Sequence, residues 1–407
     1  MAKIAFRKLP EWGPLLATVV AVAAVALAAG LGSAWYMEEH GHIVSGMNNH
    51  VVWGTPHVFA VFLIVAASGA LNVASIASVF DREAYKPLAR LSGLLAIALL
   101  AGGLMVLVLD LGRPERLIVA MTHYNFKSIF AWNIFLYTGF MVIVVAYLFS
   151  MMDRAASKSP TLYKALGWSA FVWRLILTTG TGSIFGFLVA RSAYDTALLA
   201  PLFIAASLLY GSAFTILLLA ALARPDRDAL LNDDMSRRLG FLLIIFALAV
   251  IYFTAAYHAT KLYGTKYHAF EAFILRDGGV YPLVFWLGQI GLGLALPIAI
   301  LVAVRHKGQG SRPPLILASL LVLLGGLAQM YVIIIGGQAF PVELFPGYDV
   351  SSSFADGAVA RYVPSAWEIL LGAGGIALAL LIVAFAIRLL PFLPRSLPRE
   401  EHGPAGA

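Results

Sequence analysis

The order of apolar and polar positions divides the chain into long hydrophobic runs separated by segments rich in charge, proline or glycine. Ten such runs lie near residues 14–36, 57–80, 91–111, 128–151, 165–190, 196–222, 239–262, 281–304, 314–337 and 366–389. A run of about 20 apolar residues is long enough to cross a bilayer as a helix. Because lipid offers no partner to a free backbone amide, such segments must be continuous helices, and the alternating pattern of a membrane β-barrel is absent from the sequence. The pattern predicts an all-α integral membrane protein with ten transmembrane helices.

Composition strengthens this prediction. The chain has 407 residues, of which 61% are hydrophobic and 12% charged, whereas about a quarter of the residues of a soluble domain are charged. Lys3, Arg7 and Lys8 precede the first run, and no small-residue cleavage pattern follows it, so we expect a retained helix rather than a signal peptide. With no cysteine in the sequence, thiolate-held iron–sulfur clusters, disulfides and thiol catalysis are excluded for this protein.

The distribution of basic residues predicts the orientation. If the N-terminus is cytoplasmic, most lysines and arginines fall in the inner loops, which favours both termini inside. The exceptions, on the outer side, are Arg113, Arg116, Lys127, Arg191, Lys261, Lys266, Arg276 and Arg361. The formal charge of +7 is explained by these membrane-facing loops. Nucleic-acid binding is not expected, because no basic run with interleaved aromatic residues is present.

Ionisable residues inside the predicted helices are functional candidates, because a charge buried in lipid costs several kcal/mol. They are Asp110, Arg174, His258 and Glu368, with His57 and Asp195 at helix ends. All except Arg174 fall toward the outer ends of their helices, which makes this end the expected place of a site.

The stretch "LMVLVLDLGRPERLI", residues 104–118, admits two interpretations. Asp110 marks either a helix that ends at the water boundary or a carboxylate that faces a site inside the membrane domain. His57, in "VVWGTPHVFAVF", is either an interfacial histidine after a proline turn or an imidazole facing Asp110. In the second interpretation the imidazole can take or give a proton near neutral pH.

The other buried candidates also stay open. His258 is either a packing residue or part of a site. A two-haem cytochrome b needs four membrane histidines, and only His57 and His258 are available, so haem binding is disfavoured. Arg174 needs a carboxylate, a group of carbonyls or a water-lined cavity, so it forms either a structural ion pair or part of a path to the inner side.

Four stretches carry a resemblance to a known family. They are "NNHVVWGTPHVFAVFLIVAASGALNVASIASVF", "LVLDLGRPERL", "HYNFKSIFAWNIFLYTGF" and "YVPSAWEILLGAGGIALALLIVAFAIRLLPFLP". They resemble the NrfD/PsrC family of membrane subunits, the quinone-interacting anchors of respiratory iron–sulfur oxidoreductases. The resemblance extends over about residues 40–395, and its most specific motif is Asp-Leu-Gly-Arg-Pro at 110–114. Within the family, the length, the ten helices and the first half most resemble DsrP of the Dsr sulfur-metabolism complex.

The resemblance implies an architecture and a location. Residues 1–390 would form one polytopic membrane domain of the bacterial cytoplasmic membrane, and 391–407 a cytoplasmic tail. Two four-helix bundles, at about 57–190 and 196–337, would be flanked by helices 14–36 and 366–389. It also implies a site for menaquinone or ubiquinone near the outer face, with a ferredoxin-like iron–sulfur subunit docked at the periplasmic face. A Dsr-type complex would add cytochrome c, cytochrome b and iron–sulfur reductase subunits, in contact with membrane lipid.

The resemblance also implies roles for residues. Asp110 and His57 would exchange protons with the quinone, and Arg113 would tune Asp110 or hold a quinone oxygen. The remaining quinone-binding candidates are Trp53, Trp132, Asn133 and Tyr137. Where relatives often carry a histidine in the fifth helix, this sequence reads "TTGTGSIFG", so Thr179 or Thr181 would replace it. Electrons must leave to a partner, so the protein would be the quinone-reactive subunit of an oxidoreductase without a redox centre of its own.

Two other functions are weighed against this one. A secondary transporter would explain ten helices with buried charges, but it favours broken helices at the midplane, whereas the polar groups here gather at the outer ends. A structural anchor with a degenerate quinone site would tolerate loss of the Asp110 carboxylate.

Overall fold

The computed structural model describes residues 5–153, 159–223, 230–306, 312–345, 348 and 350–394. The predicted tail lies outside the described residues from residue 395 on. So do the predicted inner-loop charges Lys3, Arg154, Lys158, Arg224, Arg227, Lys307, Arg395 and Arg399.

Helices follow the predicted runs closely. Nine stretches of the described residues are long and apolar enough to cross a membrane. They are α1 (Pro14–His40), α2 (Thr55–Ala70) with α3 (Asn72–Ser78), η2 (Glu83–Leu88) with α4 (Ala89–Leu109), α6 (Ile129–Met152), α8 (Leu199–Leu222), α9 (Asp233–Tyr263), α11 (Val280–Leu283) with η8 (Val284–Ala295) and α12 (Leu296–His306), α13 (Arg312–Tyr331) with η9 (Val332–Gly336) and α14 (Gly337–Ala339), and α15 (Ala366–Leu389). The predicted run 165–190 lies largely in α7 (Pro160–Gly186), a long helix that does not meet this criterion. The predicted fold class, an all-α polytopic membrane protein, is confirmed.

Local sequence explains several helix ends. Proline stands in the first turn of α1, α2 and α7, where its missing N–H costs nothing and its fixed φ favours the helix. α15 begins with a capping box, in which the Ser365 side chain accepts from the Glu368 backbone and the Glu368 side chain accepts from the Ser365 backbone. α4 ends at Asp110, and Gly112 then takes a φ of +68°, which reverses the chain.

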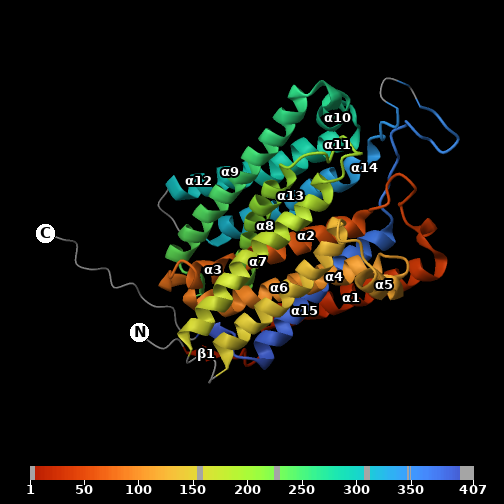
Figure 1. The fold of residues 1–407 in the computed structure, drawn as a ribbon. Helices are drawn as coiled ribbons and strands as arrows, with labels where there is room; N and C mark the ends of the chain where they lie inside the picture. Colours follow the sequence, from red (N-terminus) through yellow and green to blue (C-terminus); the bar gives the residue numbers. More distant parts are fainter. Residues whose placement is uncertain are drawn as a thin grey trace.

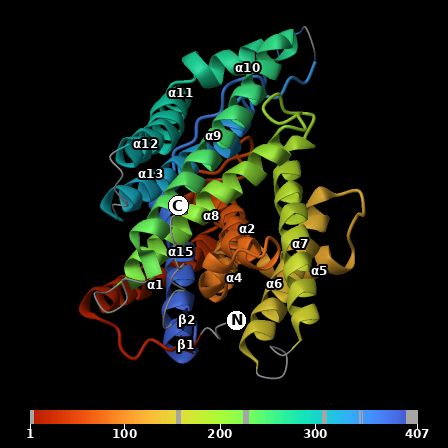
Figure 2. The same cartoon turned by 90° about the vertical axis from the view of Figure 1, so that its left-hand side faces the viewer.

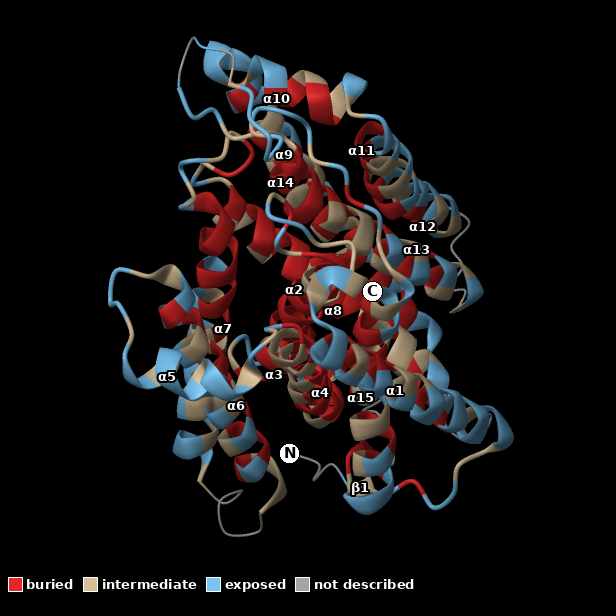
Figure 3. Cartoon of the chain, turned by 90° about the vertical axis from the view of Figure 1, so that its right-hand side faces the viewer, coloured by how far each residue is buried: buried red, intermediate tan, exposed pale blue. Residues whose placement is uncertain are grey.

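Two groups of helices meet where α2 packs against α8 (Figure 2). In the first group α2 packs against α4 and α7, and α6 packs against α7. In the second group α8 packs against α9 and α13, and α13 packs against η8 and α12. α1 and α15 pack against each other, and α15 against α4. Figure 3 shows α2 buried in the middle of the molecule and α5 (Leu117–Thr122) exposed at its edge.

The two ends of the described residues meet. β1 (Phe6–Arg7) pairs antiparallel with β2 (Leu393–Pro394). Figure 1 shows β1, α3 and α12 at one end of the bundle and α5, α10 (His268–Ala272) and α14 at the other. We call the latter the loop-rich end, because segments 41–54, 110–128, 264–279 and 340–365 lie there. The assignment of this end to the outer face stays a prediction.

Glu368 fixes two of these segments together. Its Oε1 accepts from the Tyr362 hydroxyl at 2.6 Å, and its Oε2 accepts from the backbone N–H of Gly46 and of Ser365, each at 2.8 Å. The side chain is fully buried. Both oxygens are therefore engaged by donors, and Glu368 holds the segment before α2 against the start of α15.

The contact between the two helix groups depends on glycine. A Cβ atom at Gly69 of α2 would lie 1.6 Å from the backbone oxygen of Ser207, and one at Gly211 of α8 would lie 2.0 Å from the backbone carbon of Gly69. Backbones that approach this closely are typical of small-residue crossings in membranes. Gly32 of α1, in contrast, has no atom within 4 Å of an added Cβ.

We therefore expect Gly211→Ala to destabilise the protein, since the methyl group can fit only if α2 and α8 move apart. Overpacking of this kind costs about 1–3 kcal/mol or more. Gly32→Ala is the matched control and is expected to be neutral or stabilising by up to about 1 kcal/mol, the difference in helix propensity. Thermal unfolding of the two purified variants measures this, and equal melting temperatures would contradict the proposed role of the crossing.

Candidate functional site

A cavity of about 420 Å³ opens near the loop-rich end of the first helix group. Its walls come from α2, α4, α5, α6 and the end of α7, and most of the lining side chains are aliphatic or aromatic. The polar or partly polar residues that line it are Trp53, His57, Asn133, Tyr137 and Thr138. The cavity therefore suits a largely apolar ligand that carries a small number of polar atoms.

His57 and Asp110 form a hydrogen-bonded pair at the cavity wall. Pro56 lies in the first turn of α2, and this turn meets Asp110, the C-cap residue of α4. His57 Nδ1 lies 2.7 Å from Asp110 Oδ2. The Asp110 side chain is 0% exposed and the His57 side chain 16% exposed. The two residues that the sequence suggested as partners are thus brought together, with His57 on the cavity side.

This geometry leaves specific atoms free. Because Nδ1 of His57 is engaged by the carboxylate, Nε2 is the ring nitrogen available to a ligand in the cavity. The other carboxylate oxygen, Asp110 Oδ1, is buried and has no hydrogen-bond partner among the described residues. Asp110 also caps the C-terminus of α4, where a negative charge is disfavoured by the helix dipole. His57 is therefore the principal stabilising partner of this carboxylate.

Trp53 builds an aromatic wall beside the pair. Its ring stacks on that of His57, with ring centroids 6.1 Å apart, and stands perpendicular to Phe185 at 5.6 Å. Gln338 of α14 fixes the Trp53 backbone, since its Oε1 accepts from the Trp53 N–H at 3.0 Å and its Nε2 donates to the Trp53 carbonyl at 2.9 Å. The position of Trp53 thus depends on a residue of the second helix group.

Asn133 lies on the opposite wall and is held by α7. Its Nδ2 donates to the Gly180 carbonyl at 3.2 Å, and the Thr181 hydroxyl donates to its Oδ1 at 3.5 Å. A Cβ at Gly180 would come within 2.6 Å of Leu136, so the glycine permits this approach of α6 and α7. Of the two threonines proposed to replace a histidine, Thr181 is buried and bonded to the site, whereas Thr179 is exposed.

Two predicted site residues do not join the cavity. Arg113 is exposed, because the Gly112 turn carries it away from the end of α4. It is not one of the described residues that line the cavity. Trp132 is exposed and donates its indole N–H to the Phe126 carbonyl at 2.8 Å. Neither residue therefore lines this cavity, and among the contacts of the described residues the Asp110 carboxylate bonds to His57 and not to Arg113.

Other lining residues were missed by the sequence reasoning. Phe130 and Phe185 complete the aromatic wall, and Leu117, Ala120 and Met121 of α5 line the cavity from the loop-rich end. α5 falls in a predicted outer loop and is too short to be recognised as a membrane helix, so its apolar residues give no signal in a search for membrane spans.

Arg174 is buried without a carboxylate partner. Its two terminal nitrogens lie 3.5 Å from the Ser68 carbonyl and 3.4 Å from Asn72 Oδ1, and its guanidinium lies 5.0 Å from the Phe171 ring centroid. Within the part of the sequence that the structure describes, these contacts replace the ion pair considered for it. Carbonyl and amide oxygens therefore stabilise the charge.

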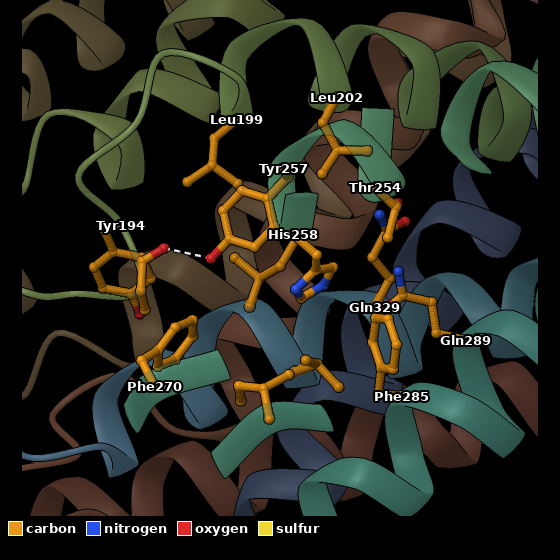
Figure 4. Close-up of a pocket in the computed structure, with 14 residues that line it drawn as sticks. Tyr194, Leu199, Leu202, Thr254, Tyr257, His258, Phe270, Phe285, Gln289 and Gln329 are labelled. Carbon is orange, nitrogen blue, oxygen red and sulfur yellow. Dashed lines mark hydrogen bonds between the residues drawn. The ribbon is translucent and has the colours of Figure 1, made fainter. Parts of the chain in front are cut away.

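The second helix group holds another histidine–carboxylate pair. His258 Nδ1 of α9 lies 2.7 Å from Glu271 Oε2 of α10, and the Glu271 side chain is 0% exposed. His258 lines a small cavity, and Figure 4 shows its ring between Tyr257 and Phe285. Glu271 was not among the candidates, because the sequence places it in an outer loop.

Asp195 belongs to this second region and lies near the surface. The Tyr267 hydroxyl donates to its Oδ2 at 2.6 Å, and Lys266 forms an ion pair with the same oxygen at 3.3 Å. The hydrogen bond from Tyr267, assisted by Lys266, lowers the pKa of Asp195 from its ordinary value. The same contact with Asp195 raises the pKa of Tyr267. Asp195 therefore stays ionised at neutral pH and is separate from the first cavity.

Comparison with known proteins identifies the family. Residues 43–343 match the family model "Polysulphide reductase, NrfD". The Hdr-like menaquinol oxidoreductase integral membrane subunit of Archaeoglobus fulgidus is 30% identical over 94% of this sequence and 95% of that protein. The C subunit of selenate reductase from Mesobacillus selenatarsenatis is 24% identical over 92% of this sequence and 94% of that protein. A polysulfide reductase protein of Wolinella succinogenes is 28% identical over 72% of this sequence and 96% of its own length. The chain belongs to the NrfD family, whose members are quinone-interacting membrane subunits of oxidoreductase complexes.

Proposed function

We propose that this protein exchanges electrons and protons between a membrane quinol and an iron–sulfur partner subunit, with the quinone ring in the first cavity and His57 at its oxygen. The observation that supports this most strongly is the buried His57–Asp110 pair at the wall of an apolar, aromatic-lined cavity. Family membership independently points to quinone chemistry.

The cavity fits the quinone class. Its volume of about 420 Å³ lies in the range of small-molecule sites, about 300–1,000 Å³. A quinone ring is flat and apolar apart from its oxygens, which matches stacked rings on one wall and isolated polar groups on the others. The Archaeoglobus relative is named for menaquinol, and we propose menaquinone or ubiquinone for this protein.

Quinol oxidation supplies two electrons and two protons, so the site needs a proton acceptor at the ring oxygen. His57 Nε2 can accept that proton because Nδ1 already donates to Asp110. The carboxylate keeps the ring in this tautomer and stabilises the positive charge that the imidazole gains. In this proposal His57 contacts the quinol, and Asp110 acts through His57 as a positioning residue.

The electrons must leave to another subunit, because the sequence holds no cysteine to bind an iron–sulfur cluster. Exposed side chains at the loop-rich end support a proposed docking surface for that subunit there. Ile43, Phe345, Tyr348 and Phe354 are all more than half exposed there. Exposed aromatic residues of this kind are typical of protein interfaces. We propose that this apolar surface is covered by a ferredoxin-like subunit.

The identity of the remaining partners is a finer proposal. The relatives are named for menaquinol oxidoreductase, selenate reductase and polysulfide reductase. One type of membrane subunit is thus combined with different catalytic subunits. The resemblance to DsrP supports a Dsr-type set of partners for this protein, as a proposal that co-purification of the native complex can test.

His57→Gln is expected to lower quinol-dependent electron transfer in the assembled complex by about 100-fold or more, since a positioned general base contributes about 10²–10⁴ in rate. Arg113→Gln is expected to stay close to wild type, because Arg113 is exposed and away from the cavity. The measurement is steady-state turnover with a soluble quinol analogue, with complex assembly verified by gel filtration.

Two further measurements sharpen this test. Asp110→Asn is expected to lower turnover while leaving binding of a quinone analogue nearly unchanged, because the carboxylate lies behind His57. His123→Gln, at an exposed position after α5, serves as the matched histidine control. Full turnover in both His57→Gln and Asp110→Asn would instead identify the protein as a structural anchor.

Phe354→Asp is expected to weaken association with the iron–sulfur subunit by about 2 kcal/mol, or about 30-fold in Kd, the loss typical of an aromatic interface anchor. Phe80→Asp is the control, since Phe80 is also more than half exposed but follows α3 at the opposite end (Figure 1). Retention of the partner on the immobilised membrane subunit measures the effect. Equal loss in both variants would show that the loop-rich end is not the docking surface.

A further inference from the structure

The second helix group contains a small cavity that the proposed quinone chemistry does not use. It lies among α8, α9, η8 and α13, has a volume of about 30 Å³, and is lined by His258, Thr254, Gln289 and Gln329 among apolar neighbours. Its lining shares no residue with the first cavity. A volume of this size accommodates about one water molecule.

Two polar atoms of residues that line this cavity, Thr254 Oγ1 and Gln329 Nε2, lack a hydrogen-bond partner among the described residues. The same holds for Oε1 of Glu271, whose Oε2 bonds to the lining residue His258. Thr254, Gln329 and Glu271 are only 4%, 2% and 0% exposed. Leaving such buried groups unsatisfied is unfavourable, so they point to a small polar ligand that can both donate and accept hydrogen bonds. Water is the ligand that fits this size and this mixture of groups.

The local backbone also distinguishes this region. π-Helical turns occur in η7 (Phe273–Asp277), η8 and η9, and residues from each of the three line the cavity: Ile274, Gln289 and Val332. π-Helical turns are rare and occur frequently at functional sites, because the extra residue in the turn re-aims neighbouring side chains. Here the ring of Phe285, in η8, lies with its centroid 4.9 Å from that of His258.

Ionisable groups link the pair to the loop-rich end. Lys261 is buried, donates to the Ser192 carbonyl at 2.5 Å, and lies 4.1 Å from the Tyr267 ring centroid. Lys261 interacts electrostatically with both Glu271 and Asp195. The titratable groups that face the pair or follow Lys261 toward the surface are Tyr194, Tyr257, Lys261, Asp195, Lys266 and Tyr267. Charge interactions thus connect Glu271, through Lys261, with the partly exposed Asp195.

We propose that the His258–Glu271 pair is a second proton-binding site, which holds one exchangeable proton and one buried water molecule in the second helix group. The proton moves between bulk water and the pair through the Lys261 and Asp195 region, with no change in oxidation state and no bond formed beyond O–H or N–H. The site is independent of the quinone cavity, so it stands or fails separately from the proposed quinone function.

The test is infrared difference spectroscopy of the full-length protein in lipid during a pH titration. Wild type is expected to show a titrating carboxyl signal, sensitive to deuterium exchange, that is lost in Glu271→Gln. Glu115→Gln, at an exposed position, is the control and should leave the signal unchanged. Quinone-analogue binding, measured on the same samples, should be the same in all three proteins.

A second variant covers the possibility that Glu271→Gln fails to fold. Thr254→Val keeps the size of the side chain and the His258–Glu271 contact but removes one contact to the water. It is expected to shift the midpoint of the carboxyl signal by about one pH unit, which is about tenfold in proton affinity. A carboxyl spectrum that does not titrate, or that is unaffected in both variants, would overturn the proposal and leave the pair as a fixed internal hydrogen bond.

Discussion

The close crossing of α2 and α8 at Gly69 and Gly211 is the contact on which the rest of the molecule depends. It joins the two helix groups at backbone distance, which only glycine permits at these positions. α2 carries His57 to the end of α4 on one side, and α8 lines the second cavity on the other. Gln338 then ties the Trp53 backbone to the second group. The first site is therefore partly built by the opposite half of the molecule.

The fold could be predicted from the sequence because lipid imposes a simple rule. A buried backbone without water must be helical, so apolar runs alone locate the helices, and α7 is recognisable despite its polar residues. The pairing of His57 with Asp110 could be suggested from the sequence for the same reason. Two ionisable residues at the same membrane depth on neighbouring helices stabilise each other when they are in contact.

The rest of the site could not be predicted, since it depends on how the loops fold back. Arg113 adjoins the Asp110 motif in sequence, but the Gly112 turn directs it to solvent. Glu271 lies in a segment that the sequence pattern predicts to be an outer loop. The short helix α10 places it within hydrogen-bond distance of His258. Neither outcome is encoded in hydropathy, because a turn of one glycine or a short helix leaves the average polarity of a segment unchanged.

Among the described residues, the three buried carboxylates Asp110, Glu271 and Glu368 differ in how their oxygens are satisfied. Both oxygens of Glu368 accept from neutral donors, two of them backbone N–H groups that can never take up a proton, so its role is to fasten segments. Asp110 and Glu271 each give one oxygen to a histidine and keep the other without a partner among the described residues. A histidine can carry the proton that a backbone amide cannot. The satisfaction of each oxygen, rather than burial alone, therefore separates the structural carboxylate from the two suited to proton exchange.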